Sequence, residues 1–264
     1  MVPPAGHQVP WMPPATPPLL DPPALAAQLE RAAAKAGFRS ERYGEAAGCP
    51  LLALTKRTSG VRPRIYLSAG IHGDEPAPPL ALLSMIESGD FDHRAVWFLC
   101  PLMNPAGLAR GIREDAEGRD LNRDYRHLAS PEVRDHVRWL GRQPNFDLAV
   151  CVHEDWETAG FYLYELNPDQ RPSSAEAMIR AVSKACPIEK SPLIEGREAK
   201  GGIIRPELNP AERELWPEAI YLQVHHTRLT YTIESPSALP LDTRITALRT
   251  ALRTAIDLAV RAAR

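Results

Sequence analysis

The sequence has little of what marks a secreted, membrane-bound or disulfide-rich protein. Only 4 of its 264 residues are cysteine, and no two of them form a CxxC pair. Cys100 and Cys151 fall in apolar segments, so we expect buried thiols, which suit a reducing compartment and a cytoplasmic location. No run of about 18 apolar residues occurs, so we expect no membrane span. The N-terminus also lacks a basic start followed by an apolar core, so we expect no signal peptide.

The sequence also lacks a strong excess of positive or negative charge. The chain has 31 Lys and Arg against 33 Asp and Glu, a formal net charge of −2, and this balance gives no case for a nucleic-acid partner. The length suits one large α/β domain. Proline is abundant by contrast, with nine in residues 1–23. We therefore predict an extended proline-rich arm over 1–23 and a single domain over 24–264.

Helical and strand-like segments alternate along the chain. The predicted strands are Leu51–Lys56, Arg64–Leu67, Ala95–Cys100, Leu148–Val152, Phe161–Leu166 and Arg228–Ile233. The predicted helices are one capped by Asp21 that runs to about Lys35, then Pro76–Glu87, Ser130 to about Leu140, Ser173–Ala185, and Leu241 to the end. Alternation of this kind predicts an α/β fold, with helices on both faces of a mostly parallel sheet.

The segment Ser68–Pro76 carries the first chemical signal. His72 and Glu75 lie three residues apart where a predicted strand ends and a helix begins, which is the edge where α/β sheets bind ligands. Gly73 between them permits a close turn. Imidazole and carboxylate are the ligand types of a catalytic zinc site. The alternative is an ordinary helix start with a histidine nearby, where acidic residues are favoured because they interact well with the helix dipole.

Two further polar residues follow predicted strands. His153 comes directly after Leu148–Val152, and Glu234 comes directly after Arg228–Ile233. If these strands are parallel neighbours, both side chains gather beside His72 and Glu75. Three ligands, His72, Glu75 and His153, would leave a fourth zinc position for water. Glu234 is then the candidate general base, because a carboxylate that is not a ligand can move the proton.

The loop after the strand Ala95–Cys100 adds the sequences Asn104-Pro-Ala-Gly107 and Asp120-Leu-Asn-Arg123. The side chains of Asn122 and Arg123 offer amide and guanidinium donors suited to holding a carboxylate. Asp120 could bond the outer nitrogen of a metal-bound histidine. The alternative is a charged surface loop with internal ion pairs.

These pieces, with His153 and Thr232-Ile-Glu234, resemble the zinc carboxypeptidase family of carboxypeptidase A-like metallopeptidases, especially short bacterial members such as murein peptide amidases. The matching pieces appear in the same order as in the family, and they span residues 64 to about 235. It implies a three-layer α/β/α fold with a mixed sheet of about eight strands. It also implies one zinc ion per chain, held by His72, Glu75 and His153.

The same resemblance implies further roles. Glu234 would be the general base and acid, and Asn122 with Arg123 would bind the terminal carboxylate of the substrate. Arg113 would stabilise the oxyanion, and Asp120 would orient His72. Arg110 competes with Arg113 for the oxyanion role. A tyrosine that closes over the substrate has no clear counterpart: Tyr221 is the candidate, with Tyr162, Tyr164 and Tyr231 as rivals.

We therefore predict a zinc metallopeptidase of carboxypeptidase type that hydrolyses an amide next to a free carboxylate in a small peptide, which could be murein-derived. One alternative is a deacylase of N-acyl amino acids, as in aspartoacylase and succinylglutamate desuccinylase. The other is a peptide-binding domain without turnover. The paired histidines His225 and His226 are expected to be structural or surface residues.

Overall fold

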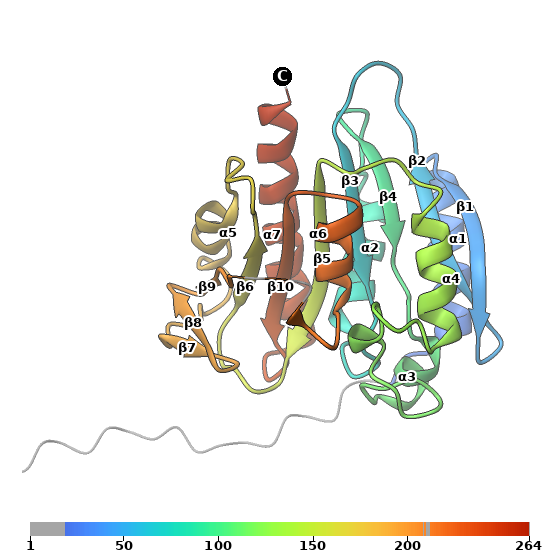
Figure 1. Ribbon diagram of the computed structural model, residues 1–264. Coiled ribbons are helices and arrows are strands. Elements are labelled where there is room, and N and C mark those ends of the chain that lie inside the picture. Colours follow the sequence, from blue (N-terminus) through green and yellow to red (C-terminus); the bar gives the residue numbers. More distant parts are fainter. Residues whose placement is uncertain (1–18, 208, 210–211, 264) are drawn as a thin grey trace, which may run out of the picture.

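A single mixed sheet of ten strands runs through the molecule, with the strand order β1-β2-β4-β3-β5-β10-β6-β9-β8-β7 (Figure 1). The computed structural model describes residues 19–207, 209 and 212–263. The strands are β1 (Arg39–Ala46), β2 (Cys49–Lys56), β3 (Arg64–Ala69), β4 (Val96–Cys100), β5 (Leu148–Asp155), β6 (Tyr162–Leu166), β7 (Leu193–Ile194), β8 (Arg197–Lys200), β9 (Ile203–Ile204) and β10 (Thr230–Pro236).

The centre of the sheet is parallel and its flanks are largely antiparallel. β4, β3, β5 and β10 are parallel neighbours. β2 and β1 continue the sheet antiparallel on one side, and β6 does so on the other. The expected α/β fold with a mixed sheet is confirmed. The sheet has ten strands rather than the expected eight, and four of the ten, the edge strand β1 and the short strands β7, β8 and β9, are not among the six strands predicted by range.

Helices cover both faces of the sheet, as Figure 1 shows. They are α1 (Pro22–Lys35), α2 (Ala77–Glu87), α3 (Pro105–Arg110), α4 (Pro131–Leu140), α5 (Ala175–Val182), α6 (Glu218–His225) and α7 (Leu241–Ala262), with a 3-10 turn η1 (Leu121–Arg123). One core packs α1, α2, α5 and α7 against one face of the sheet. A second core packs α4 and α6 against the other face. The predicted three layers are therefore present.

Side-chain alternation assigns the polar residues of the central strands to the α4/α6 face. Val150 and Val152 of β5 lie in the first core, while Cys151 lies in the second. Because successive side chains of a strand point to opposite faces, His153 shares the face of Cys151. Glu234 is offset by one residue from Ile233, which packs in the first core, so it too points to the α4/α6 side. Both residues lie inside their strands. The sequence had suggested positions directly after the strands.

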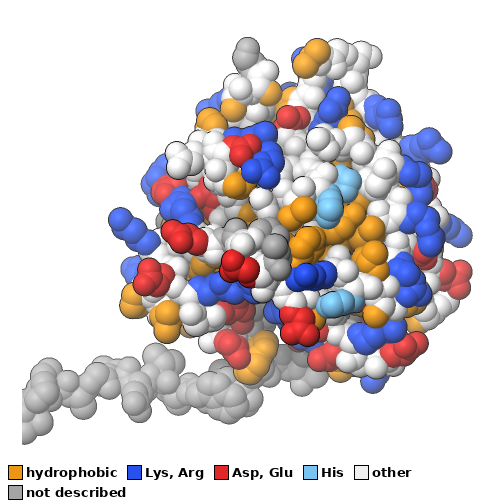
Figure 2. All heavy atoms as spheres, in the orientation of Figure 1, with side chains coloured by type: hydrophobic (Ala, Val, Ile, Leu, Met, Phe, Trp, Pro, Cys, Tyr) orange, Lys and Arg blue, Asp and Glu red, His pale blue; other side chains and the backbone are white. Residues whose placement is uncertain are grey.

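The remaining features of the fold concern the charge on the surface, the length of the helices and the N-terminal region. Acidic and basic side chains lie among one another over the face drawn in Figure 2. No helix in the described part of the chain is both long and apolar enough to cross a bilayer. Helix α1 begins at Pro22 with Asp21 as its N-cap, as expected. The predicted arm lies mostly in residues 1–18, outside the described residues, so the division into arm and domain stays a prediction.

Candidate metal centre and its cavity

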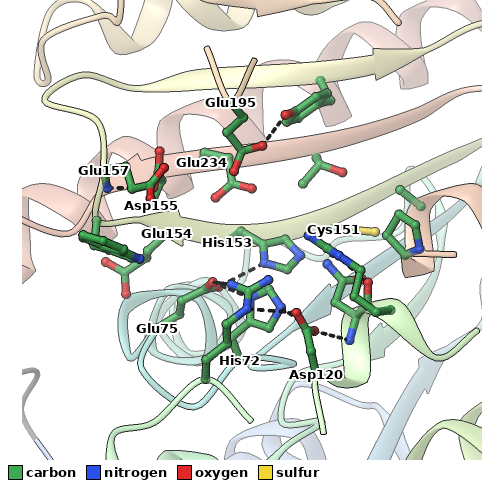
Figure 3. Close-up of a pocket in the computed structure, with 18 of the residues that line it drawn as sticks. His72, Glu75, Asp120, Cys151, His153, Glu154, Asp155, Glu157, Glu195 and Glu234 are labelled. Carbon is green, nitrogen blue, oxygen red and sulfur yellow. Dashed lines mark hydrogen bonds and ion pairs between the residues drawn. The ribbon is translucent and has the colours of Figure 1, made fainter. Parts of the chain in front are cut away.

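Two histidines and one glutamate converge at the edge of the sheet. Nδ1 of His72 lies 2.5 Å from Oε1 of Glu75, and Nδ1 of His153 lies 3.0 Å from its Oε2. All three side chains are buried. One ligand atom from each lies within 4.8 Å of the other two. Figure 3 shows the two imidazoles facing this carboxylate. The structure thus brings together the three residues predicted as metal ligands.

The electrostatics of this cluster favour positive charge between the three groups. Burial by itself lowers the pKa of His72, but the adjacent carboxylates of Glu75 and Asp120 outweigh burial and raise it to about 9. Burial by itself raises the pKa of Glu75, yet His72 and His153 hold it well below its usual range. A carboxylate that stays ionised between two imidazole nitrogens is a donor set suited to a divalent cation.

Glu234 lies beside the cluster because of strand register. It is paired with His153 across the parallel strands β10 and β5. Figure 3 shows its carboxylate over the two histidines. Burial raises the pKa of Glu234 well above its usual range, and the negative charges of Glu75 and Glu195 act in the same direction. A carboxyl group with a raised pKa holds a proton more readily than a free carboxyl group does.

Arg113 and Asp120 lie on the outer side of His72. Nε of Arg113 donates to Oδ2 of Asp120 at 3.0 Å. The other oxygen of Asp120 lies 3.4 Å from Nε2 of His72, which is within ion-pair distance but long for a hydrogen bond. Nη1 of Arg113 lies 3.2 Å from Nδ1 of His72. Asp120 is therefore placed against the nitrogen of His72 that faces away from Glu75.

Asn122 is held in one orientation. Its Oδ1 accepts a hydrogen bond of 2.9 Å from the backbone N–H of Glu218, so its amide NH₂ group is left to donate into the cavity. Glu218 is itself fixed at the start of α6, where its carboxylate accepts from the hydroxyls of Tyr66 and Ser68 at 2.7 Å. Arg123 uses Nη1 to donate to the Asn122 carbonyl at 2.8 Å.

A cavity of about 670 Å³ contains these groups. All the predicted site residues line it except Tyr221, namely His72, Glu75, Arg113, Asp120, Asn122, Arg123, His153 and Glu234. Tyr221 instead packs its ring against Tyr125 and His225. Arg110 is not among the lining residues either, whereas Tyr164 is.

The sequence did not point to several other residues of the cavity wall. Glu195, Arg197 and Arg213 come from the segment 190–217, which has no clear periodicity. Glu154 lies next to His153, and its carboxylate accepts from Nη1 of Arg244 at 2.6 Å. Only the unusually acidic run from His153 to Glu157 gave any signal for this part of the wall.

Sequence comparison finds similarity to known hydrolases over about half of the chain. Residues 61–186 match the succinylglutamate desuccinylase/aspartoacylase catalytic domain. Carboxypeptidase 2 from Trichophyton rubrum is 31% identical over 136 residues, which cover 46% of this chain and 24% of that protein. The match thus spans about a quarter of this curated relative.

Comparison of structures extends the match to most of the chain. A protein of Shewanella amazonensis assigned to the metallopeptidases is 25% identical, with a TM-score of 0.78 over 89% of this chain and 91% of that one. A metallo-carboxypeptidase from Pseudomonas aeruginosa, in complex with (2-guanidinoethylmercapto)succinic acid, shares the fold at 20% identity, with a TM-score of 0.64 over 89% of this chain and 68% of that one. Taken together, these matches support a zinc carboxypeptidase-like family for this chain.

Proposed function

We propose that this protein is a zinc-dependent hydrolase of carboxypeptidase type, which cleaves an amide bond next to a free carboxylate in a small peptide. The observation that carries the proposal is the pairing of Glu234 with His153 across β10 and β5. This register sets a buried carboxyl group beside a His-Glu-His donor set, in the same cavity as the donors of Asn122 and Arg123.

The donor set fits one zinc ion per chain. His72, Glu75 and His153 would hold it, since two imidazole nitrogens and one carboxylate are the protein ligands of many catalytic zinc sites. Asp120, at 3.4 Å from the far nitrogen of His72, would keep that ring in the tautomer whose Nδ1 is free to bind. A zinc ion bound there would lower the pKa of a water molecule and polarise the substrate carbonyl.

Glu234 would move the proton. It accepts a proton from the attacking water as the oxygen bonds to the carbonyl carbon. It then returns the proton to the amide nitrogen as the carbon–nitrogen bond breaks, which releases a carboxylic acid and an amine. The raised pKa of Glu234 makes its carboxylate a stronger base for the first of these steps. Arg113, which lies 3.2 Å from His72, would place its guanidinium against the negative charge that develops on the carbonyl oxygen.

Asn122 and Arg123 would bind the free carboxylate of the substrate. The amide of Asn122 is turned so that its NH₂ group is available, and Arg123 keeps most of its N–H groups unengaged among the described residues. A guanidinium and an amide together can hold both oxygens of a carboxylate. Whether the bond lies in a murein-derived peptide stays a prediction, as does the cytoplasmic location.

A second candidate keeps the same chemistry and changes the substrate. The match of residues 61–186 to the succinylglutamate desuccinylase/aspartoacylase domain favours deacylation of an N-acyl amino acid. Such a substrate also presents an amide beside a free carboxylate, so the same donors would serve it.

The test is hydrolysis of three matched compounds by the zinc-loaded protein: a tripeptide, the same tripeptide with an amidated C-terminus, and an N-acetyl amino acid. We expect cleavage of the free tripeptide and little cleavage of the amide. Preference for the N-acetyl amino acid would select the deacylase. Binding of all three without cleavage of any would contradict both and support a binding domain.

A further inference from the structure

A buried ion pair joins β5 to α7 next to the metal centre. Nη1 of Arg244, in the first turn of α7, donates to Oε1 of Glu154 at 2.6 Å. The two side chains are 8% and 0% exposed, and each is the other's only ion-pair partner among the described residues. Taking two charges out of water is unfavourable unless they stay paired, so each member of this pair is held in place by the other.

The second oxygen of Glu154 is bound to the start of α2. Its Oε2 accepts a hydrogen bond of 2.8 Å from the backbone N–H of Ala77, the first residue of that helix. Backbone N–H groups in the first turn of a helix have no partner within the helix, and a carboxylate there also interacts well with the helix dipole. Glu154 therefore ties α2 to β5, while Arg244 ties the same carboxylate to α7.

The two segments that Glu154 joins carry the candidate metal ligands. His153 precedes Glu154 in β5, and because side chains alternate along a strand, the two residues point to opposite faces of the sheet (Figure 3). Glu75 lies two residues before Ala77, in the turn that leads into α2. The contact between Nδ1 of His153 and Oε2 of Glu75, at 3.0 Å, thus spans the same two segments that the Glu154 carboxylate joins.

We infer that Arg244 is a positioning residue of the metal centre. It holds the carboxylate of Glu154 against the start of α2, and this carboxylate keeps Glu75 and His153 at the separation that a metal ion needs. Without Arg244, the buried charge of Glu154 would be uncompensated, and its side chain would leave Ala77 and turn toward the cavity, which both members of the pair line. The inference rests on the zinc ion of the proposed function, and it does not depend on the substrate.

The sign of the effect separates positioning from simple electrostatics. Arg244 is a positive charge in the cavity that contains the metal centre, so its removal would strengthen the binding of a divalent cation if only charge mattered. Positioning predicts the opposite, because the loss of a residue that orients metal ligands weakens metal binding by about 10- to 100-fold. We therefore expect Arg244→Gln to bind zinc at least about tenfold more weakly than the wild type. Competition with a chelating indicator measures this affinity without turnover.

Arg253→Gln is the matched control. Arg253 is also an arginine of α7, and it donates two hydrogen bonds of 2.9 Å to Asp90, beyond the last residue of α2. This variant loses an ion pair of the same helix at the end of α2 that is remote from the metal centre. Its zinc affinity should equal that of the wild type.

The Glu154→Gln/Arg244→Gln double variant tests whether the uncompensated charge is the cause. The amide oxygen introduced at position 154 can still accept from the N–H of Ala77, and no buried charge is left without a partner. We expect zinc affinity within about threefold of the wild type, so the effects of the two changes should not add. A loss as large as in Arg244→Gln alone would overturn the inference.

The visible spectrum of the cobalt-loaded protein gives a second readout, because it reports how the ligands are arranged around the metal. It should change in Arg244→Gln and stay unchanged in Arg253→Gln. Equal zinc affinity of the wild type and Arg244→Gln would overturn the inference and leave the proposed function standing, whereas absence of zinc binding by the wild type would overturn both. If Arg244→Gln does not fold, the double variant decides the question: folding with normal zinc affinity supports the inference, and weak zinc binding or failure to fold overturns it.

Discussion

Glu234 and His153 occupy paired positions on two parallel strands, β10 and β5. Both side chains point to the same face of the sheet, so the strand register alone sets a carboxyl group beside an imidazole that also contacts Glu75. No loop needs to move to bring these groups together. The acid–base group proposed here is consequently as rigid as the centre of the sheet, which is the kind of scaffold that precise positioning requires.

Removing the ionisable group of Glu234 should separate catalysis from metal binding. The Glu234→Gln variant has nearly the same shape, and Glu234 is not one of the three clustered ligand residues. We therefore expect unchanged zinc content and a fall in kcat of about 10³-fold, within the range for loss of a positioned general acid–base group. Steady-state kinetics together with metal analysis measure both quantities.

Glu176→Gln is the control for that experiment, because Glu176 is a surface residue of α5 whose partner, Arg205, is also on the surface. Its kcat should match the wild type. Near-normal turnover in Glu234→Gln would show that another group moves the proton.

Loss of the Arg123 guanidinium should weaken substrate binding more than it slows the chemical step. In Arg123→Gln we expect KM to rise about tenfold or more for a substrate with a free carboxylate, since a charge-assisted hydrogen bond is lost. For the same substrate with an amidated end, the variant and the wild type should differ little. An equal loss on both substrates would argue against a carboxylate contact at Arg123.

A methyl group at Gly73 should disrupt the turn that joins His72 to Glu75. A Cβ atom there would lie 1.9 Å from the carbonyl carbon of Gly107 and 2.3 Å from the nitrogen of Leu108. These are backbone atoms and cannot rotate away, so Gly73→Ala should lower the free energy of unfolding by about 3 kcal/mol or more. Denaturant titration measures the change, and metal analysis should find less bound zinc.

Gly141→Ala provides the matched control. Gly141 ends α4 with helical backbone angles, and the nearest atom to an added Cβ lies at 3.5 Å. We expect this variant to be as stable as the wild type or slightly more so. Equal free energies of unfolding for the two glycine variants would contradict this prediction. They would mean that the segments around Gly73 and Gly107 can move apart without loss of stability.

Stability should fall in mild acid because His136 is buried in its neutral form. Its Nε2 lies 2.9 Å from the hydroxyl of Tyr66, which donates to Glu218. Tyr66 must therefore accept from the Nε2–H group, and the hydroxyl of Tyr125, 2.7 Å from Nδ1, is the donor on the other side. Burial lowers the pKa of His136 to about 3, and His226 adds to the effect.

The sign of this contribution follows from that lowered pKa. The unfolded chain binds a proton at His136 below pH 6.5, while the folded protein resists it down to pH 3. The stabilisation is thus complete above pH 6.5, and about 1.4 kcal/mol is lost for each pH unit below it. His136→Gln should show a smaller loss between pH 6.5 and 4, measured by denaturant titration. His93→Gln, at an exposed site, should keep the wild-type dependence, and identical slopes in all three proteins would contradict the argument.

The sequence predicted the centre of the fold well. Val96–Cys100 and Leu148–Asp155 stand out as strands because sheets covered on both faces need continuous apolar runs. The metal-binding candidates followed from polar residues at the ends of such runs. The strand ends were placed two or three residues short, since His153 and Glu234 are polar and yet continue the ladder between β5 and β10.

The edges of the sheet could not be predicted in the same way. β1, Arg39–Ala46, is largely exposed and charged, as edge strands often are, so it shows no apolar alternation. β7, β8 and β9 have two to four residues each and depend on pairing with each other and with β6. Arg197 and Arg213 come from this segment, and only the fold brings them to the cavity that contains Arg123.

Metal content is the measurement that tests the central claim most directly. We expect about one zinc ion per chain in the purified protein and almost none in His153→Ala, because that change removes one of three ligands. His225→Ala, an exposed histidine of α6, should bind zinc as the wild type does. Absence of zinc from the wild-type protein even after metal is added, or full retention of zinc in His153→Ala, would contradict the assignment of His72, Glu75 and His153 as a metal centre.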